Sequence, residues 1–432
     1  MHPTLKRALP LLTVLILAGI VVFVWRNRAP DPTPQPHPPV QIPPPSPALS
    51  VLGETPDWSR LDVYQNTITR AEFERLLTTV FVTGGAWRNF IEIDEQEARI
   101  RTDGDGIFHH RFAAPGAETP APRPWKSTAD LPPAPEGKPL EGLHIAIDPG
   151  HIGGEWAKIE ERWLQVGNSS PIREGDMTLR VAQLLKPKLE GLGAVVSLVR
   201  TKTEPVTPLR PDSLAELAKD SAKPADSPEA LRKLAERLFY RTAEIRARAA
   251  LVNQTLKPDL VLCLHFNADP WGDSNNPTLV TRSHLHLILN GAYTDEEVGF
   301  SDQRFSLLEK LLSRTHDEEA RVAATVADVF AEKSGLPPFS YPAGSTNAVS
   351  VNGHPYLWAR NLLANRLYER PVIYMEPWLM NSVSDHPRMA AGDYEGLREV
   401  NGKMQPSIFR EYADFLTEGL ARHYAAKRGI KD

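Results

Sequence analysis

The chain has 432 residues with a formal net charge of -5, and 41% of its residues are hydrophobic. This length allows two or three domains with one large core. A mildly acidic balance gives no strongly basic face, so we expect no nucleic-acid partner. The single cysteine, Cys263, excludes an intrachain disulfide and a cysteine-rich zinc cluster. Its place in an apolar run predicts a buried packing residue.

The N-terminal region predicts a membrane anchor followed by a linker. Residues 8–25 form an apolar run without a charge, with Lys6 and Arg7 before it. This run is long enough to span a bilayer and long for a signal-peptide core, and no clear Ala-x-Ala cleavage site follows. We therefore predict a transmembrane signal anchor over 1–28, with a cleaved signal peptide as the alternative. Residues 29–57 are proline-rich and predict an extended linker.

Residues 58–113 predict a small α+β domain of unknown role. Thr69 is an N-cap residue for a helix whose apolar side chains repeat at helical spacing from Phe73 onward. His109 and His110 are adjacent in a strand-like segment, where neighbours point to opposite faces, so we do not expect them to bind one metal. A second proline-rich linker is expected at 114–140.

Residues 141–432 predict one large α/β domain. The expected strands are 143–147, 194–199, 259–264, 284–289 and 371–375, and the expected helices are 174–191, 228–256, 303–335 and 407–426. This alternation predicts an open, mostly parallel, twisted sheet flanked by helices on both faces. Pro187 should kink or shorten the first helix. The stretches 201–227 and 270–350 are long for simple connections and predict lids or walls around a site.

Four side chains suited to metal or acid–base chemistry lie at the ends of these elements. His151 follows the first strand, Glu174 opens the first helix, His265 follows the third strand, and Glu376 ends the last strand. The carboxyl ends of parallel strands lie together along one edge, where sites form. Two imidazoles and a carboxylate can hold zinc, and a further carboxylate can take a proton from water. The pattern predicts a zinc hydrolase, with Asp148 orienting an imidazole ligand.

Each of these residues also has another interpretation. His284 and His286 stand two apart on one strand, so they face the same side and form a rival chelating pair, although such residues more often flank a pocket. Glu174 at a helix start also complements the helix dipole. Glu376 could be a buried carboxylate paired with an arginine.

Six segments, in order along residues 141–432, resemble the type 3 family of zinc-dependent N-acetylmuramoyl-L-alanine amidases of bacterial cell walls. They are 145–154, 174–179, 197–201, 248–253, 262–268 and 372–381. Together their order and spacing make the match specific. The chain departs from the family pattern in several places. A longer, more polar segment at 155–172 replaces a glycine-rich loop, the lysine after the ligand glutamate is absent, and Leu264 replaces a serine.

The resemblance implies one zinc ion per chain, held by His151, Glu174 and His265, with Glu376 as the general base. It implies hydrolysis of the amide between N-acetylmuramic acid and L-alanine in peptidoglycan. The alternatives are another zinc peptidase or amidase of the envelope, and a non-catalytic peptidoglycan-binding protein on an amidase fold. We expect a cell-envelope location, with the N-terminal helix in the membrane and the catalytic domain periplasmic or otherwise extracytoplasmic. The segments 155–172 and 270–350 could restrict access until an activator protein opens the cleft.

Overall fold

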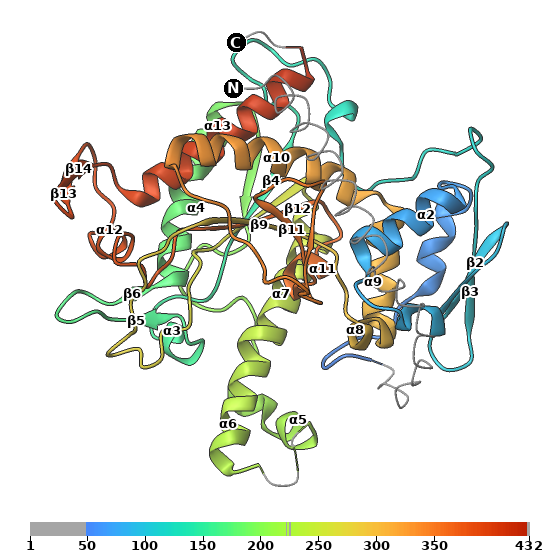
Figure 1. Cartoon of the computed structure of the whole chain (residues 1–432), viewed down its shortest axis with the longest axis horizontal. Helices are drawn as coiled ribbons and strands as arrows, with labels where there is room; N and C mark the ends of the chain where they lie inside the picture. The colour runs from blue at the N-terminus through green and yellow to red at the C-terminus, as the bar shows by residue number, and fades with distance from the viewer. Residues whose placement is uncertain (1–48, 222, 224–225, 430–432) are drawn as a thin grey trace, which may run out of the picture. The chain divides into compact units, whose positions relative to one another are not determined.

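A seven-stranded sheet forms the centre of the large region, and helices flank it (Figure 1). The computed structural model describes residues 49–221, 223 and 226–429. The predicted anchor at 1–28 and the linker up to residue 48 lie outside the described residues. Within the described residues, no helix is both long enough and apolar enough to cross a membrane.

The strands and helices keep the order of the chain. The strands are β1 Ile91–Ile93, β2 Glu97–Arg101, β3 Ile107–Arg111, β4 His144–Pro149, β5 Trp163–Leu164, β6 Ile172–Arg173, β7 Val195–Leu198, β8 Leu260–Leu264, β9 Leu285–Leu289, β10 Val349–Ser350, β11 Leu357–Ala359, β12 Val372–Pro377, β13 Arg398–Val400 and β14 Lys403–Gln405. The α-helices are α2 Arg70–Leu76, α3 Trp156–Ile159, α4 Glu174–Gly191, α5 Ala215–Asp220, α6 Pro228–Arg237, α7 Glu244–Ala250, α8 Asp295–Gly299, α9 Ser301–Leu312, α10 Thr315–Ser334, α11 Leu363–Leu367, α12 His386–Ala390 and α13 Ile408–Lys427. Shorter 3-10 and π segments are η1 Trp58–Tyr64, η2 Leu77–Phe81, η3 Ala86–Asn89, η4 Thr128–Asp130, η5 Pro211–Leu214, η6 Leu238–Ala243 and η7 Leu251–Leu256.

The central sheet has the strand order β10-β11-β9-β12-β8-β4-β7. Strands β12, β8, β4 and β7 are parallel to one another, as the sequence predicts. Strand β9 runs antiparallel to β12, so the sheet is mixed at this side. The parallel register brings the ends of β4, β8 and β12 to one edge, because Pro149 pairs with Leu264 and Met375 pairs with the same residue from the other side.

Side chains of the sheet alternate between two apolar layers. Leu262 and Met375 belong to the large cluster that also holds buried residues of α4, α10 and α13. Val261 and Cys263 belong to a second cluster, with Val252 of η7. Strands buried on both faces are apolar throughout, which explains the unbroken apolar runs in the sequence. The prediction that Cys263 is a buried packing residue is confirmed.

One helix prediction is wrong, and the shortening expected of another is not observed. The helix expected at 303–335 is divided into α9 and α10, because Arg314 between them has a left-handed backbone with φ of 62° and ends the first helix. Helix α4 is not shortened at Pro187 but continues to its predicted end. Leu185 and Leu189, on either side of the proline, are fully buried, so core packing holds the helix through the missing backbone bond.

Residues 58–113 contain helix α2 and the antiparallel sheet β1-β2-β3. The Thr69 side chain accepts a hydrogen bond from the Glu72 backbone N–H, which confirms the predicted N-cap. On β3, His110 is fully buried and the His109 side chain is exposed, so the two do point to opposite faces. The apolar residues of this region belong to the same cluster as those of the central sheet. A domain boundary at 114–140 stays a prediction.

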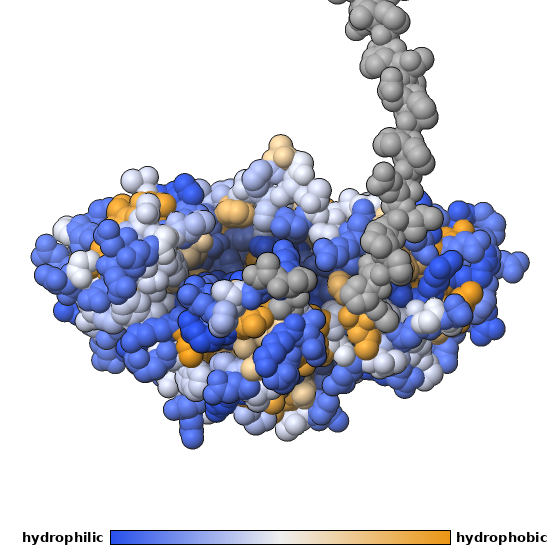
Figure 2. All heavy atoms as spheres, turned by 90° about the horizontal axis from the view of Figure 1, so that it is seen from below, coloured by the Kyte–Doolittle hydropathy of each residue, from blue (hydrophilic) through white to orange (hydrophobic). Residues whose placement is uncertain are grey.

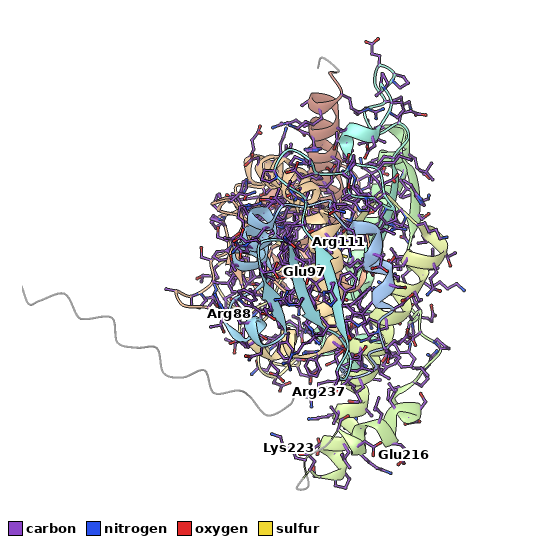
Figure 3. All side chains as sticks on the ribbon, turned by 90° about the vertical axis from the view of Figure 1, so that its right-hand side faces the viewer. Arg88, Glu97, Arg111, Glu216, Lys223 and Arg237 are labelled. Atoms are coloured by element: carbon purple, nitrogen blue, oxygen red, sulfur yellow. The ribbon has the colours of Figure 1, made fainter. Side chains whose placement is uncertain are left out.

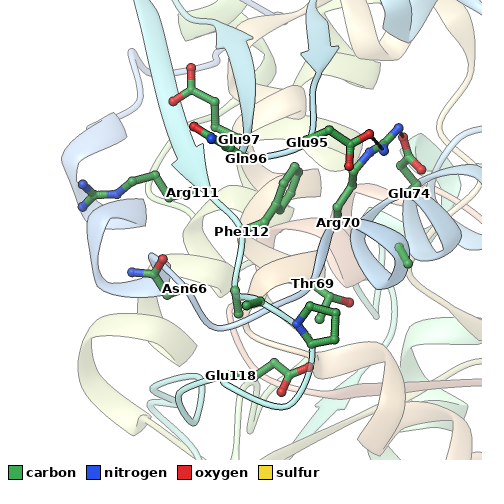
Figure 4. A pocket seen from close by; sticks show the side chains of 14 residues that line it. Asn66, Thr69, Arg70, Glu74, Glu95, Gln96, Glu97, Arg111, Phe112 and Glu118 are labelled. Carbon is green, nitrogen blue, oxygen red and sulfur yellow. Dashed lines mark hydrogen bonds and ion pairs between the residues drawn. The ribbon is translucent and has the colours of Figure 1, made fainter.

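The face in Figure 2 is largely hydrophilic, with hydrophobic residues scattered between charged ones. Figure 3 shows Glu97 and Arg111 on the small sheet, and Glu216 and Arg237 on the projecting arm that α5 and α6 form. An open hollow of about 950 Å³ lies beside the small sheet (Figure 4). Of the two arginines that line it, Arg70 is paired with Glu74 and Glu95.

Candidate metal centre and catalytic site

His151 reaches the sheet edge through a tight turn after β4. Its own φ is 61°, in the left-handed region, and Gly150 lies directly against the ring of His265. A Cβ on Gly150 would lie 2.3 Å from Cε1 of that ring, so only glycine leaves room for this approach. The Pro-Gly-His turn thus brings two imidazoles together, with ring centroids 4.8 Å apart.

Glu174 is the first residue of α4, and its carboxylate points into the protein. Its side chain is only 2% exposed. The Phe266 backbone N–H donates a hydrogen bond of 3.0 Å to Oε1 of Glu174. The backbone N–H of Glu174 donates to the Arg162 carbonyl. Burial alone would raise the pKa of Glu174, but the surrounding imidazoles and the Arg162 guanidinium outweigh burial and lower it. The carboxylate is therefore kept ionised, as a metal ligand must be.

His265 follows β8, as predicted, and is held by the neighbouring strand. Its backbone N–H donates to the Met375 carbonyl, and its ring stacks on Tyr374 at a centroid distance of 4.3 Å. Its Nδ1 lies 3.2 Å from Glu174 Oε1. The fold therefore fixes both the position and the plane of this imidazole.

The structure brings three of the four predicted side chains into one cluster. Ligand atoms of His151, Glu174 and His265 all lie within 4.8 Å of one another. Burial lowers the pKa of His151 well below its usual range, so the ring is neutral and has a lone pair to offer. Two imidazoles and one carboxylate are a donor set suited to zinc. The residues present fit such an ion.

Glu160, and not Asp148, orients the first imidazole. His151 Nδ1 lies 2.8 Å from Glu160 Oε1, which leaves Nε2 directed at the cluster. Asp148 instead accepts hydrogen bonds from the Arg248 guanidinium, at 2.8 Å, and from the Tyr368 hydroxyl, at 2.5 Å. The predicted role of Asp148 is therefore wrong, because its carboxylate is hydrogen-bonded to the buried Arg248 of α7 and not to an imidazole.

Arg162 brings a cation to the cluster. Its Nε lies 3.2 Å from Glu174 Oε2 and 3.3 Å from His151 Nε2, and its side chain is 32% exposed. Glu174 Oε2 and His151 Nε2 are also the atoms with which these two side chains would bind a metal ion. A metal ion bound to both atoms would therefore require the guanidinium to withdraw, and its partial exposure gives it space to do so.

Glu376 lies near the end of β12, beside the cluster. It is two residues after Tyr374, so it shares the sheet face on which Tyr374 stacks against His265. Burial raises the pKa of Glu376, because it penalises the charged form of the carboxylate. The alternative of an arginine pair is not observed among the described residues. Its one ion-pair contact among the described residues is with His286, at 3.9 Å.

The rival pair, His284 and His286, does not join the metal cluster. A cavity of about 90 Å³ opens beside the cluster, and His151, Arg162 and His265 are among the residues that line it. Sequence reasoning missed Glu160 and Arg162 as site residues. The polar character of 155–172 was the available signal, but it was interpreted as restricting access to the cleft.

No family model and no curated protein sequence matches the chain. Similar solved structures do exist. These are N-acetylmuramoyl-L-alanine amidases. Ami1 from Mycobacterium smegmatis has 18% identity, covers 66% of this chain and 99% of its own, and has a TM-score of 0.37. The amidase from Clostridium difficile 630 has 15% identity, covers 68% and 100%, and has a TM-score of 0.34.

A third similar structure is the CwlD amidase from Clostridioides difficile in complex with the GerS lipoprotein. It has 10% identity, covers 66% of this chain and 100% of its own, and has a TM-score of 0.37. These proteins are of the class that the six sequence segments resemble. At such identities, function has to be inferred from the side chains of the site itself.

Proposed function

We propose that this protein is a zinc-dependent N-acetylmuramoyl-L-alanine amidase of peptidoglycan. The observation that supports this most directly is the convergence of His151, Glu174 and His265, with Glu376 on the adjacent strand end. Three side chains that would hold the ion, next to a carboxylate outside that cluster, form an arrangement suited to hydrolysis.

The chain's own residues divide the work of amide hydrolysis. His151, Glu174 and His265 would hold the ion, and zinc would supply a Lewis acid that makes water a stronger nucleophile near neutral pH. Glu376 takes a proton from the water as its oxygen bonds to the carbonyl carbon. It then gives that proton to the nitrogen as the carbon–nitrogen bond breaks. The products are a lactyl carboxylate on the glycan and a free amino group on the stem peptide.

The environment of Glu376 suits both halves of this cycle. A base works best when its pKa lies near the working pH, and burial raises the pKa of Glu376 toward that range. Its side chain keeps 21% of its surface exposed, so a substrate or a water molecule can reach it.

Product analysis on purified sacculi tests the bond and the substrate together. We expect free stem peptides and intact glycan chains. Cleavage within the stem peptides would favour the alternative, another zinc peptidase of the envelope. A protein that binds sacculi without bound metal, and without activity when zinc is added, would be a non-catalytic binding protein.

Two variants test the assignment of roles. Glu376→Gln should retain zinc and lose most activity, on the order of 10²-fold or more, because the amide cannot accept the proton. His265→Ala should lose the metal itself, as measured by metal analysis after dialysis. A fully active Glu376→Gln enzyme would refute the assignment of the base.

Location and partners are part of the proposal. We propose that the protein is held at the membrane by residues 1–28, with its catalytic part outside the cytoplasm, and that an activator protein can open the cleft. Fractionation of cells that express the full chain tests the first point. Truncation of 155–172 with unchanged basal activity would count against an occluding role, and the loss of Arg162 and Glu160 must be controlled by point variants.

A further inference from the structure

Glu376 and His286 face each other across two antiparallel strands. They are a directly opposed pair in the register of β12 and β9, and the Trp378 backbone N–H donates to the His284 carbonyl at 2.9 Å, which fixes that register. Opposed side chains share one sheet face. His286 Nδ1 lies 3.9 Å from Glu376 Oε2. Among the residues that the structure describes, no group donates a hydrogen bond to this carboxylate, and His286 is its one ion-pair contact.

The His286 imidazole is buried between aromatic side chains, and its two nitrogens have different surroundings. Its side chain is 2% exposed, and its ring lies 4.6 Å from Phe339 and 5.4 Å from Tyr341, between centroids. Its Nε2 is buried without a hydrogen-bond partner in the described part of the chain. Burial lowers the pKa of His286 to about 3, so the ring is neutral and carries a single N–H. On the other side of the ring, Nδ1 faces the Glu376 carboxylate at 3.9 Å.

We propose that His286 is a positioning residue for Glu376: its Nδ1–H donates to Oε2 and aims the other carboxylate oxygen at the attacking water. This inference rests on the proposed function. The 3.9 Å separation is longer than a hydrogen bond, and catalytic hydrogen bonds often tighten only when substrate binds. A neutral donor suits this task better than arginine, because a full positive charge would lower the basicity that Glu376 needs.

A packing role is the rival explanation, since the ring fills space between two aromatic side chains. Three variants separate the two. His286→Asn keeps an amide N–H close to the position of Nδ1, His286→Gln places its amide near Nε2, and His286→Phe keeps the ring and removes the donor. If the residue positions Glu376, Asn should retain activity and Phe should not. If it only packs, Phe should be the better substitute.

We expect His286→Phe to lower kcat by about 10- to 100-fold, the range typical of residues that orient a functional group. KM should change by about twofold or less and zinc content should not change, because neither substrate contacts nor ligands are removed. His286→Asn should stay within about fivefold of the wild type, and His286→Gln should resemble Phe. His284→Phe, one residue before β9, is the matched control and should keep its kcat.

A kcat of His286→Phe equal to the wild type, or equal losses in the Asn and Phe variants, would overturn the positioning role while leaving the proposed function intact. A fully active Glu376→Gln enzyme would overturn the proposed function first. Nitrogen-15 NMR of the histidine rings in the full chain gives a readout independent of turnover. We expect the Nδ1-protonated tautomer at His286 and a change of its Nδ1 shift in Glu376→Ala. The Nε2-protonated tautomer would refute the inference.

Discussion

Gly150→Ala should remove metal binding without unfolding the protein. The backbone of Gly150 is not in the left-handed region, so alanine can adopt it, and only space opposes the substitution. The new Cβ would lie 2.3 Å from Cε1, 2.4 Å from Nε2 and 2.6 Å from Nδ1 of His265. One methyl group therefore collides with three atoms of the ligand ring.

The size of the effect follows from these distances. Ordinary contact begins at 3.4 Å, so the ring must move by about 1.1 Å, which is 3.4 minus 2.3 Å. Metal–ligand distances tolerate only about 0.2 Å. We expect zinc affinity to fall by about 100-fold or more, since disturbing even an outer partner costs about 10- to 100-fold. The strain of the inserted methyl group should cost about 1–3 kcal/mol of unfolding free energy.

Zinc affinity is measured by competition with a chromophoric chelator, and folding by circular dichroism and urea unfolding. Gly191→Ala is the matched control: it lies at the end of α4, nothing is within 4 Å of its added Cβ, and it should bind zinc normally. A folded Gly150→Ala protein that binds zinc as tightly as the wild type would refute the packing of Gly150 on His265, or the role of His265 as a ligand.

Three further substitutions test the electrostatics of the fold and the site. Arg248→Met leaves Asp148 and Glu244 buried without their partner and should cost about 3–5 kcal/mol in urea unfolding, so an unchanged midpoint would contradict the ion pair. Burial lowers the pKa of His110 to about 4, so the unfolded chain binds a proton that the folded protein refuses, and stability is lost as the pH falls from about 6.5 to about 4. His110→Phe should lessen this loss by up to about 3 kcal/mol between pH 7 and pH 4, and an identical pH dependence would argue against a neutral buried ring. Arg162→Gln should tighten zinc binding by about tenfold or more, because a cation that contacts two ligand side chains opposes a metal ion, and weaker binding would show that the guanidinium supports the site instead.

Much of the site could be predicted because its signals are local. A polar side chain that directly follows an apolar strand is visible in the sequence, and parallel strands carry such residues to one edge. This reasoning placed His151 and His265 correctly after β4 and β8, and Glu174 at the first residue of α4. The direction of β9 was not predicted, because an apolar run of five residues reads the same in a parallel or an antiparallel strand.

The partners of these residues depended on contacts between distant parts of the chain. Asp148 meets Arg248, 100 residues away, so the orientation of His151 passes to Glu160 in a segment without apolar periodicity. His286 opposes Glu376 only because β9 is reversed. Sequence by itself therefore determined which strands are buried and where their polar ends lie, because the pattern of apolar and polar residues that decides burial is local in the chain. Tertiary structure alone decided which charge meets which, because electrostatic pairing depends on distances that the folded backbone sets.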